Sequence, residues 1–339
     1  MADIRDDILL CIKVNETRLT YPLGYVFLCG GQFSLVTVEK DEDGNEREVP
    51  FLSFRDAINR RCLELSPDFA RDLWNAEEFY DWLHHSNVEN LIDFELDFAD
   101  LSSLIVLVLE GPGAYAELGS FTALQRISPK LIVIVNQQAL PHNSFVELGP
   151  LRLIQKRYPG HLLKLNWNTH FHVENGGRSV SSKLDDSEDA KQVYRNLAKD
   201  CIEAIDIEFK KNGPKLTRFD KYNNGHIALL LSELTYFFHA LKLTEIILYL
   251  EYLGIKLERK KVKEIIYLLR KLNIIDTLEY MSDTFYIPGP EYVERFKFRY
   301  EEDSESIIPT KNHVVLRHAV LEYYRENDNF RYNALGLRK

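Results

Sequence analysis

The sequence predicts an α/β protein with a parallel sheet, followed by a mostly helical region. Three observations predict this fold. In the first half of the 339-residue chain, apolar β-rich runs alternate with amphipathic segments, an order typical of parallel sheets. A polar stretch rich in glycine and serine then follows at 173–190. Beyond it, amphipathic segments of helix length fill most of the remaining sequence.

Four runs in the first half have the composition of strands. Their apolar residues are consecutive rather than alternate, as in strands that are covered on both faces. The runs are "GYVFLCGG" (24–31), "LIVLVLEGPG" (104–113), "KLIVIVNQ" (130–137) and the weaker "HLLKLNW" (161–167). A polar hairpin, "VEKDEDGNEREVP", is expected after the first of them. Because parallel sheets bind ligands beyond the carboxyl ends of their strands, "CGG", "EGPG" and "VNQ" lie at the expected binding edge.

Helical patterns separate these strands and continue in the second half. In the first half they are 53–65, 68–86, 88–103 and 115–127; in the second half they are 191–212, 224–242, 244–254 and a basic helix at 258–272. Two short strands are expected within "DTLEYMSDTFYIPG". Helix, helix and hairpin in this order indicate a winged helix-turn-helix. We therefore predict an α/β domain at 1–172, a linker at 173–190 and a helical, winged-helix domain at 191–339.

Composition and charge exclude several classes of protein. The content of 45% apolar and 28% charged residues is that of a folded soluble chain, and no apolar run reaches the length of a membrane span. The N-terminus is too acidic for a signal peptide, and four cysteines without regular spacing indicate a reduced, cytoplasmic setting and no metal site. A net charge of −10 excludes a generic nucleic-acid binder, so local patches must carry any such role.

Glu117 is the first candidate for chemistry. It follows a strand end and the turn "GPG", in what we expect to be the first turn of a helix, where the helix dipole stabilises an anion. A carboxylate there can stabilise or attack the anomeric carbon of a sugar, as in retaining glycosidases. The alternative is a solvated glutamate that only aids the helix. From the pattern alone, both readings stay open.

Several motifs together resemble the effector proteins of bacterial retrons. These motifs are "VFLCGG", "SFRDAI", "EGPGAYAELGSF", "KLIVIVNQ" and "SFVELGPLRLI", in this order over residues 24–160. The group that they resemble has a nucleoside 2-deoxyribosyltransferase-like domain and a C-terminal winged helix, which the remainder of the chain resembles by layout.

The resemblance assigns roles to residues. It implies that Glu117, in the first "ELG", is the catalytic carboxylate for cleavage of an N-glycosidic bond. Glu147, in the second "ELG", is then structural or accessory. Asn143 and Ser144 lie in a loop expected to contact the ligand. In the transferases this loop reaches a neighbouring subunit, which implies a homo-oligomer or a higher assembly.

One position departs from the transferases. They carry an Asp six residues before the catalytic Glu, whereas this chain has Gly111 there, preceded by Glu110. The departure speaks against deoxyribosyl transfer and leaves room for a ribose-bearing substrate. The resemblance implies NAD or a related nucleotide as that substrate, with no further cofactor, because nicotinamide is already a cationic leaving group. Other candidate ligand contacts are the strand-end residues Gly30, Gly31, Pro112 and Gly113, and Arg55 in the next helix. For the first two the alternative is an ordinary tight turn, and for Arg55 a surface arginine.

The basic helix is the candidate nucleic-acid surface. Its cations are Lys260, Lys261, Lys263, Arg270 and Lys271, with apolar residues expected to pack inward. Such a helix in an acidic chain favours contact with phosphates, although a protein-docking winged helix has the same pattern. The family implies a retron reverse transcriptase and its multicopy single-stranded DNA (msDNA) as partners.

The sequence therefore predicts an effector of antiphage defence that cleaves NAD and is held inactive by msDNA and reverse transcriptase. Two alternatives remain. One is a true deoxyribosyltransferase acting on nucleosides or nucleotides, and the other is a DNA-binding regulator that only senses a nucleotide.

Overall fold

A computed structural model describes residues 3–34, 36–41, 44–79, 90–140, 142–174 and 179–336. The described chain forms two compact units. The α/β unit contains the residues from Leu23 to 79 and from Phe98 to Gly213. The helical unit contains those up to Pro22, from 90 to Asp97, and from Pro214 onward. The chain thus leaves the helical unit and returns to it, a division that differs from the predicted boundaries at 172 and 191.

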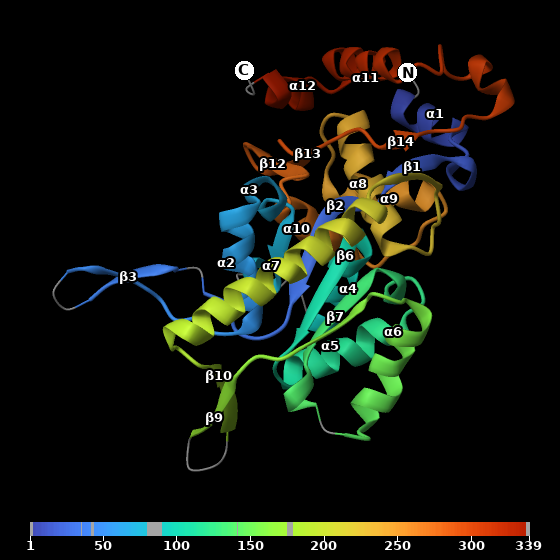
Figure 1. Cartoon of the computed structure of the whole chain (residues 1–339). Helices are drawn as coiled ribbons and strands as arrows, with labels where there is room; N and C mark the ends of the chain where they lie inside the picture. Colours follow the sequence, from blue (N-terminus) through green and yellow to red (C-terminus); the bar gives the residue numbers. More distant parts are fainter. Residues whose placement is uncertain are drawn as a thin grey trace. The chain divides into compact units, whose positions relative to one another are not determined.

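The α/β unit is built on a five-stranded sheet in the order β5-β2-β6-β7-β8, and every neighbouring pair is parallel. This confirms the predicted parallel sheet (Figure 1). Its strands are β2 (Leu23–Cys29), β5 (Leu73–Asn75), β6 (Ser102–Leu109), β7 (Leu131–Asn136) and β8 (Leu162–Leu165). All residues of β6 and β7 are buried, which explains their continuous apolar sequence.

Helices cover the sheet on both faces. On one face α2 (Phe54–Leu65) and α7 (Glu188–Lys211) pack against each other and contribute to one apolar core with the strands. On the other face, the ring of Phe27 on β2 contacts Phe98 of α4 (Leu91–Leu101) and Phe121 of α5 (Pro112–Ala123). The predicted hairpin after β2 is confirmed as β3 (Val38–Lys40) and β4 (Glu46–Glu48).

Three expectations for this part of the chain are corrected. The predicted helix 68–86 is interrupted: α3 (Pro67–Ala70) ends before β5, which pairs with β2; residues 80–89 lie outside the described residues. The predicted linker contains an antiparallel pair, β9 (Thr169–Glu174) and β10 (Ser179–Leu184). Helix α7, expected in the C-terminal domain, belongs to the α/β unit because its apolar face, including Tyr194 and Ile202, is buried in that core.

The helical unit contains the predicted order of helices and hairpin. These elements are α8 (Asn224–Phe237), α9 (Leu243–Tyr252), α10 (Arg259–Lys271), β12 (Ile275–Tyr280) and β13 (Asp283–Pro288). The two strands pair antiparallel across a tight turn in which Met281 has a φ of 52°. Helices α1 (Ile4–Cys11), α11 (His313–Asn327) and α12 (Asn329–Gly336) and the short η7 (Glu302–Ser306) were also not expected from the sequence.

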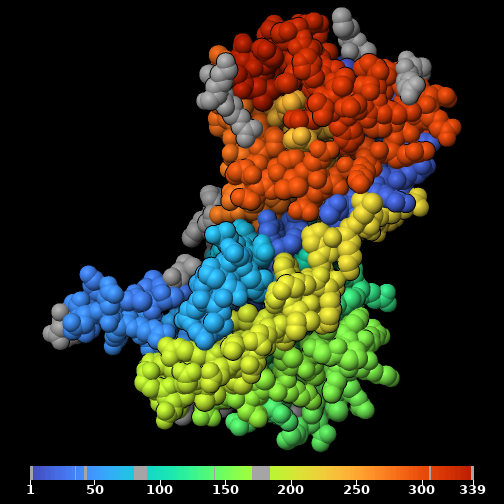
Figure 2. All heavy atoms as spheres, turned by 45° about the horizontal axis from the view of Figure 1, so that its top comes forward, coloured from blue at the N-terminus to red at the C-terminus, as the bar shows by residue number. Residues whose placement is uncertain are grey.

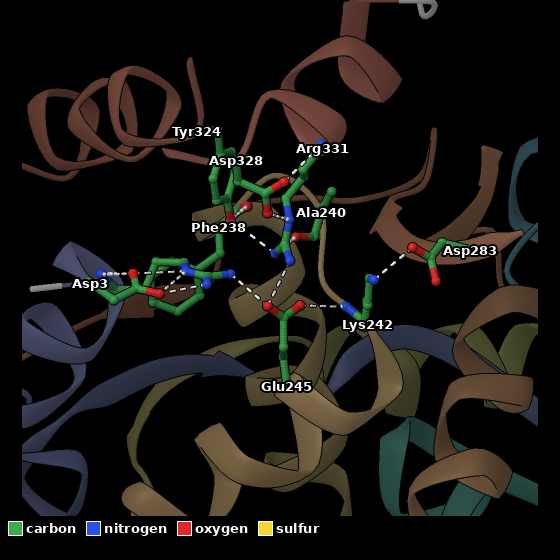
Figure 3. Close-up of polar contacts among 10 residues, drawn as sticks. Asp3, Phe238, Ala240, Lys242, Glu245, Asp283, Tyr324, Asp328 and Arg331 are labelled. Carbon is green, nitrogen blue, oxygen red and sulfur yellow. Dashed lines mark hydrogen bonds and ion pairs between the residues drawn. The ribbon is translucent and has the colours of Figure 1, made fainter. Parts of the chain in front are cut away.

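A buried polar network joins the first and last helices of this unit to α9 (Figure 3). Glu245, in the first turn of α9, accepts hydrogen bonds from Arg5 at 2.8 Å and Arg331 at 2.7 Å. Asp3 pairs with Arg5, and Asp328 with Arg331. Because each arginine is paired with two carboxylates, the positive charges are compensated inside the unit.

A second sheet in the helical unit has the order β11-β1-β14 and is antiparallel throughout. Its strands, β1 (Arg18–Tyr21), β11 (Lys215–Arg218) and β14 (Phe296–Lys297), come from distant parts of the chain. In the part of the chain that the structure describes, no helix combines the length and apolarity that a membrane crossing requires.

Candidate active site

Glu117 lies at the carboxyl end of the sheet, but not where the sequence suggested. Helix α5 begins at Pro112, so Glu117 occupies its second turn and not the first. The dipole argument, which applies to the first turn, therefore does not explain this carboxylate. Gly111 is the N-cap with an extended φ of −162°, and an added Cβ at Gly111 or Gly113 would meet nothing within 4 Å. The backbone before Glu117 is thus open on its outer side.

A buried arginine stands beside Glu117. Arg55, in the first turn of α2, has an exposed fraction of 1%, which excludes the alternative of a surface arginine. Its Nη2 donates to Glu77, and its Nη1 donates to the carbonyl of Leu28 at 3.4 Å. The Nε of Arg55, one carboxylate oxygen of Glu77 and the Oε2 of Glu117 are buried without a hydrogen-bond partner among the described residues. Such a set of unsatisfied polar atoms is typical of a site that a ligand or water completes.

The charge state of Glu117 follows from this environment. Burial raises the pKa of Glu117 to about 7; the positive charge of Arg55 opposes the rise, and the negative charge of Glu77 adds to it. A carboxyl group with this pKa is partly ionised at neutral pH. It can therefore act either as an anion or as a proton donor, which is a property of catalytic carboxyl groups.

Glu110 anchors the end of β6 to the start of α2. Its carboxylate accepts the backbone N–H groups of Phe54 at 2.7 Å and Arg55 at 3.1 Å. Burial raises the pKa of Glu110 to about 7, against the opposing effect of these hydrogen bonds. The bonds occupy the free N–H groups of a helix N-terminus. Glu110, which the sequence predicts to contact substrate, thus holds the helix that carries Arg55.

The two glycines after β2 have a packing role. Gly30 has a φ of +146°, and an added Cβ would lie 2.7 Å from the carbonyl oxygen of Val108. A Cβ at Gly31 would lie 2.7 Å from that of Ser53 and 3.0 Å from the Oε2 of Glu110. The protein itself thus requires glycine at both positions, as the tight-turn alternative expected.

The predicted contact loop after β7 is held by its own hydrogen bonds. Glu147 accepts the N–H of Asn143 at 2.8 Å, and its own N–H donates to the Oγ of Ser144 at 3.2 Å. Asn143 has a φ of 55°. A π-helical turn, η5 (Glu147–Leu151), follows and packs against α5. This geometry gives the carboxylate of the second "ELG" a structural task, while π-helical turns are frequent near functional sites.

Glu77 is the residue of this site that the sequence reasoning missed. It follows the three-residue edge strand β5, within "WNAEEF", and that stretch was interpreted as helix. The neighbouring Glu78 accepts the N–H of Asn75 at 2.8 Å and so shapes the turn. A strand as short as β5 gives almost no periodic signal, so no pattern in the sequence marks the strand end.

The basic helix is less available to phosphates than its composition suggests. The predicted apolar positions Val262, Ile265, Ile266, Leu268 and Leu269 of α10 are all buried, as expected. Lys261, however, pairs with the buried Asp97 at 2.5 Å, and Lys271 lies over the ring of Tyr267. Lys260 is half-buried, whereas Lys263 and Arg270 are exposed. Lys261 therefore has a structural contact, because removing it would break an ion pair of a buried carboxylate.

Comparison with known proteins places this geometry in context. Residues 52–277 match the family described as STM3845 retron effector protein. A relative from Escherichia coli, named as the proposed ribosyltransferase/DNA-binding protein of retron Ec73, is 25% identical over 287 residues, 84% of this chain and 82% of the relative. The counterpart named for retron Ec86, also from Escherichia coli, is 28% identical over 114 residues, 33% of this chain and 37% of the relative.

Proposed function

The chain belongs to the STM3845 retron effector protein family, and from this premise we propose that its α/β unit cleaves the N-glycosidic bond of NAD or a related nucleotide. The observation that carries the proposal is the half-buried Glu117, whose Oε2 is buried and unpartnered, beside Arg55 and Glu77 at the carboxyl end of the sheet. The name of the Ec73 relative, a proposed ribosyltransferase, supports this class of chemistry.

The proposed reaction needs few catalytic groups from the protein. The bond between C1′ and the nicotinamide nitrogen breaks, and its electron pair leaves with nicotinamide, which therefore needs no proton. The ionised carboxylate of Glu117 stabilises the positive charge that develops on the ribose. The oxygen of a water molecule then bonds to C1′, one of its O–H bonds breaks, and the proton leaves to solvent. Glu77 and Glu110 serve indirectly, because they hold Arg55 and the start of α2 in place.

We further propose that the helical unit is a winged helix that receives msDNA and the reverse transcriptase, and that this complex restrains the enzyme. The DNA-binding half of the relatives' names supports a nucleic-acid partner. A homo-oligomer or higher assembly belongs to the same proposal, with the loop around Asn143 and Ser144 as its expected contact.

The direct test is product release from purified protein. The parent chain should release nicotinamide from NAD, as followed by chromatography. Glu117→Gln keeps the shape and removes the charge, and should lower the rate at least about 100-fold. Glu147→Gln is the matched control from the second "ELG" and should keep most of the activity, because its carboxylate serves the loop.

The outcomes separate the alternatives. Free bases released from deoxynucleosides, with NAD untouched, would show a deoxyribosyltransferase. Binding of a nucleotide without any product would show a sensor. Loss of activity in Glu147→Gln with full activity in Glu117→Gln would mean that the second "ELG" carries the chemistry.

A further inference from the structure

The sheet β11-β1-β14 brings together cations that are far apart in the sequence. Arg18, on the central strand, lies directly opposite Arg218 on β11 and Lys297 on β14. Residues directly opposite each other point to the same face of a sheet, and like charges in such pairs are destabilising. All three side chains are exposed, and no ion pair joins them to a carboxylate in the described parts of the chain.

Successive side chains of these strands point to opposite faces of the sheet, so the cationic face lies opposite an apolar face. Leu19 and Phe296, on the opposite face, are buried. The chain around β14 reads "RFKFRY", so Arg295 and Arg299 have the same parity as Lys297, and the aromatic residues alternate with them. The same alternation places Thr20 beside Arg18. Figure 2 shows early (blue), middle (yellow) and late (orange) parts of the chain exposed next to one another, as the pairing of these strands requires.

We propose that this cationic face, defined by Arg18, Arg218, Lys297, Arg295 and Arg299, binds the phosphate backbone of nucleic acid. A row of like charges across three strands costs stability in the free protein, and a polyanion laid across the row removes that cost. Because the chain has a net charge of −10, attraction of a polyanion depends on local groups of cations such as this sheet face.

We choose nucleic acid over an acidic protein as the partner because the proposed function assigns a nucleic-acid partner to the helical unit. Neighbouring strands are spaced about 4.8 Å apart, so one extended polyanion can contact all three cations of the row. Arginine, which supplies four of the five cations, binds phosphate in a bidentate manner. The inference rests on the proposed function only for the class of partner, and it assigns that partner to the sheet rather than to α10, whose Lys261 is already paired.

The test compares three double variants of the full chain. Arg18→Gln with Lys297→Gln removes both like-charge pairs of the row and keeps Arg218, which donates to the carbonyl of Asn15 at 2.7 Å. Lys263→Gln with Arg270→Gln removes two exposed cations of α10. Arg71→Gln with Lys164→Gln removes two exposed cations of the α/β unit and is the control for net charge. Each is titrated with a fluorescent single-stranded DNA oligonucleotide over a salt series.

The sheet variant should bind DNA more weakly, and its plot of log affinity against log salt should be shallower by about 1.4, the value for two lost contacts on a single strand. Its melting temperature without DNA should stay the same or rise, because like-charge pairs are gone, which excludes misfolding as the cause.

A sheet variant with the slope of the control would overturn the proposal. The proposal would also be overturned if the parent protein did not bind DNA and its sheet bound polyglutamate, because the surface would then bind an acidic protein. Nicotinamide release is measured on the same three variants. An inactive parent that still binds DNA through the sheet would contradict the proposed glycosidase activity and leave the sheet assignment standing.

Discussion

Arg55 pairs with Glu77, while the Oε2 of Glu117 stays buried without a hydrogen-bond partner. Arg55 thus forms an ion pair with Glu77 and acts on Glu117 through its charge. Glu77 acts on Glu117 in two ways, because it holds the neighbouring positive charge and adds a negative one. The pKa of Glu117 therefore depends on Glu77, a residue that no motif in the sequence marks.

The first prediction concerns the pH dependence of activity. If the anion of Glu117 is the working form, the rate of the parent should rise with pH through about 7. Glu77→Gln removes a negative charge and leaves Arg55 to act on Glu117, so the pKa should fall and the midpoint should move to lower pH by on the order of one unit. Initial rates over a pH series measure it.

The control for this prediction lies in the same turn. Glu78→Gln disturbs the bond to Asn75 and keeps the charges around Arg55. Its midpoint should match the parent even if its rate is lower. An unchanged or higher midpoint in Glu77→Gln would show that Glu77 does not set the pKa of Glu117.

The second prediction concerns stability without substrate. The folded-state pKa of Glu117, about 7, lies above its ordinary value of 4.5. The folded state thus holds the proton more tightly, and this contribution to stability is lost as pH rises from about 4.5 to about 7. Glu117→Gln cannot ionise. It should be close to the parent at about pH 5 and more stable by roughly 2 kcal/mol at about pH 8, after allowance for partial solvent exposure.

Urea unfolding of both proteins at the two pH values measures this difference. The two proteins share every other titrating group, so the change in their difference with pH isolates Glu117. A constant difference would mean that Glu117 is not desolvated in the folded protein.

The third prediction separates packing from ligand contact among the glycines. Gly31→Ala places a Cβ 2.7 Å from that of Ser53 and should lower the free energy of unfolding by about 1–3 kcal/mol. Gly113→Ala meets nothing within 4 Å and lies inside α5, so its stability should be equal or slightly higher. Equal losses in the two variants would contradict the packing role. If Gly113→Ala alone raises the KM for NAD, the substrate approaches α5 at that position.

The fourth prediction concerns α10. Lys261→Gln breaks the ion pair of the buried Asp97 with Lys261 but keeps its hydrogen bond from Asn224, and should cost on the order of 2 kcal/mol of stability. Lys263→Gln, two positions away and exposed, should change stability by less than about 0.5 kcal/mol. Thermal unfolding of both variants measures these changes in stability. A Lys261→Gln protein as stable as the parent would mean that Lys261 has no structural role and can bind phosphate.

The sheet and its long helices could be predicted because their apolar runs are long and periodic. β6 and β7 are apolar throughout since both faces are covered, and α10 places each predicted apolar residue inside. Some short elements have no such signal, although the polar turn did predict the short β3-β4 hairpin. β5 has three residues, and its identity comes from pairing with β2 rather than from its own composition.

The candidate site was predictable only in part, for a related reason. "EGPGAYAELG" marks Glu117 locally, but the neighbours of Glu117 are set by tertiary packing. Glu110 accepts a hydrogen bond from the start of α2, and Glu77, which pairs with Arg55, follows another strand. The cationic row of Arg18, Arg218 and Lys297 shows the limit most clearly, because no local window of sequence contains two of its members.

The network around Glu245 sets an order of events during synthesis. Arg5 leaves the ribosome early, but its partners Glu245 and Arg331 follow only near the end of the chain. The described residues of the α/β unit, by contrast, are all made once Gly213 has emerged. Since domains fold as units while the chain grows, a nascent chain passes through a stage in which the unit with Glu117 can be assembled and the unit with Glu245 cannot.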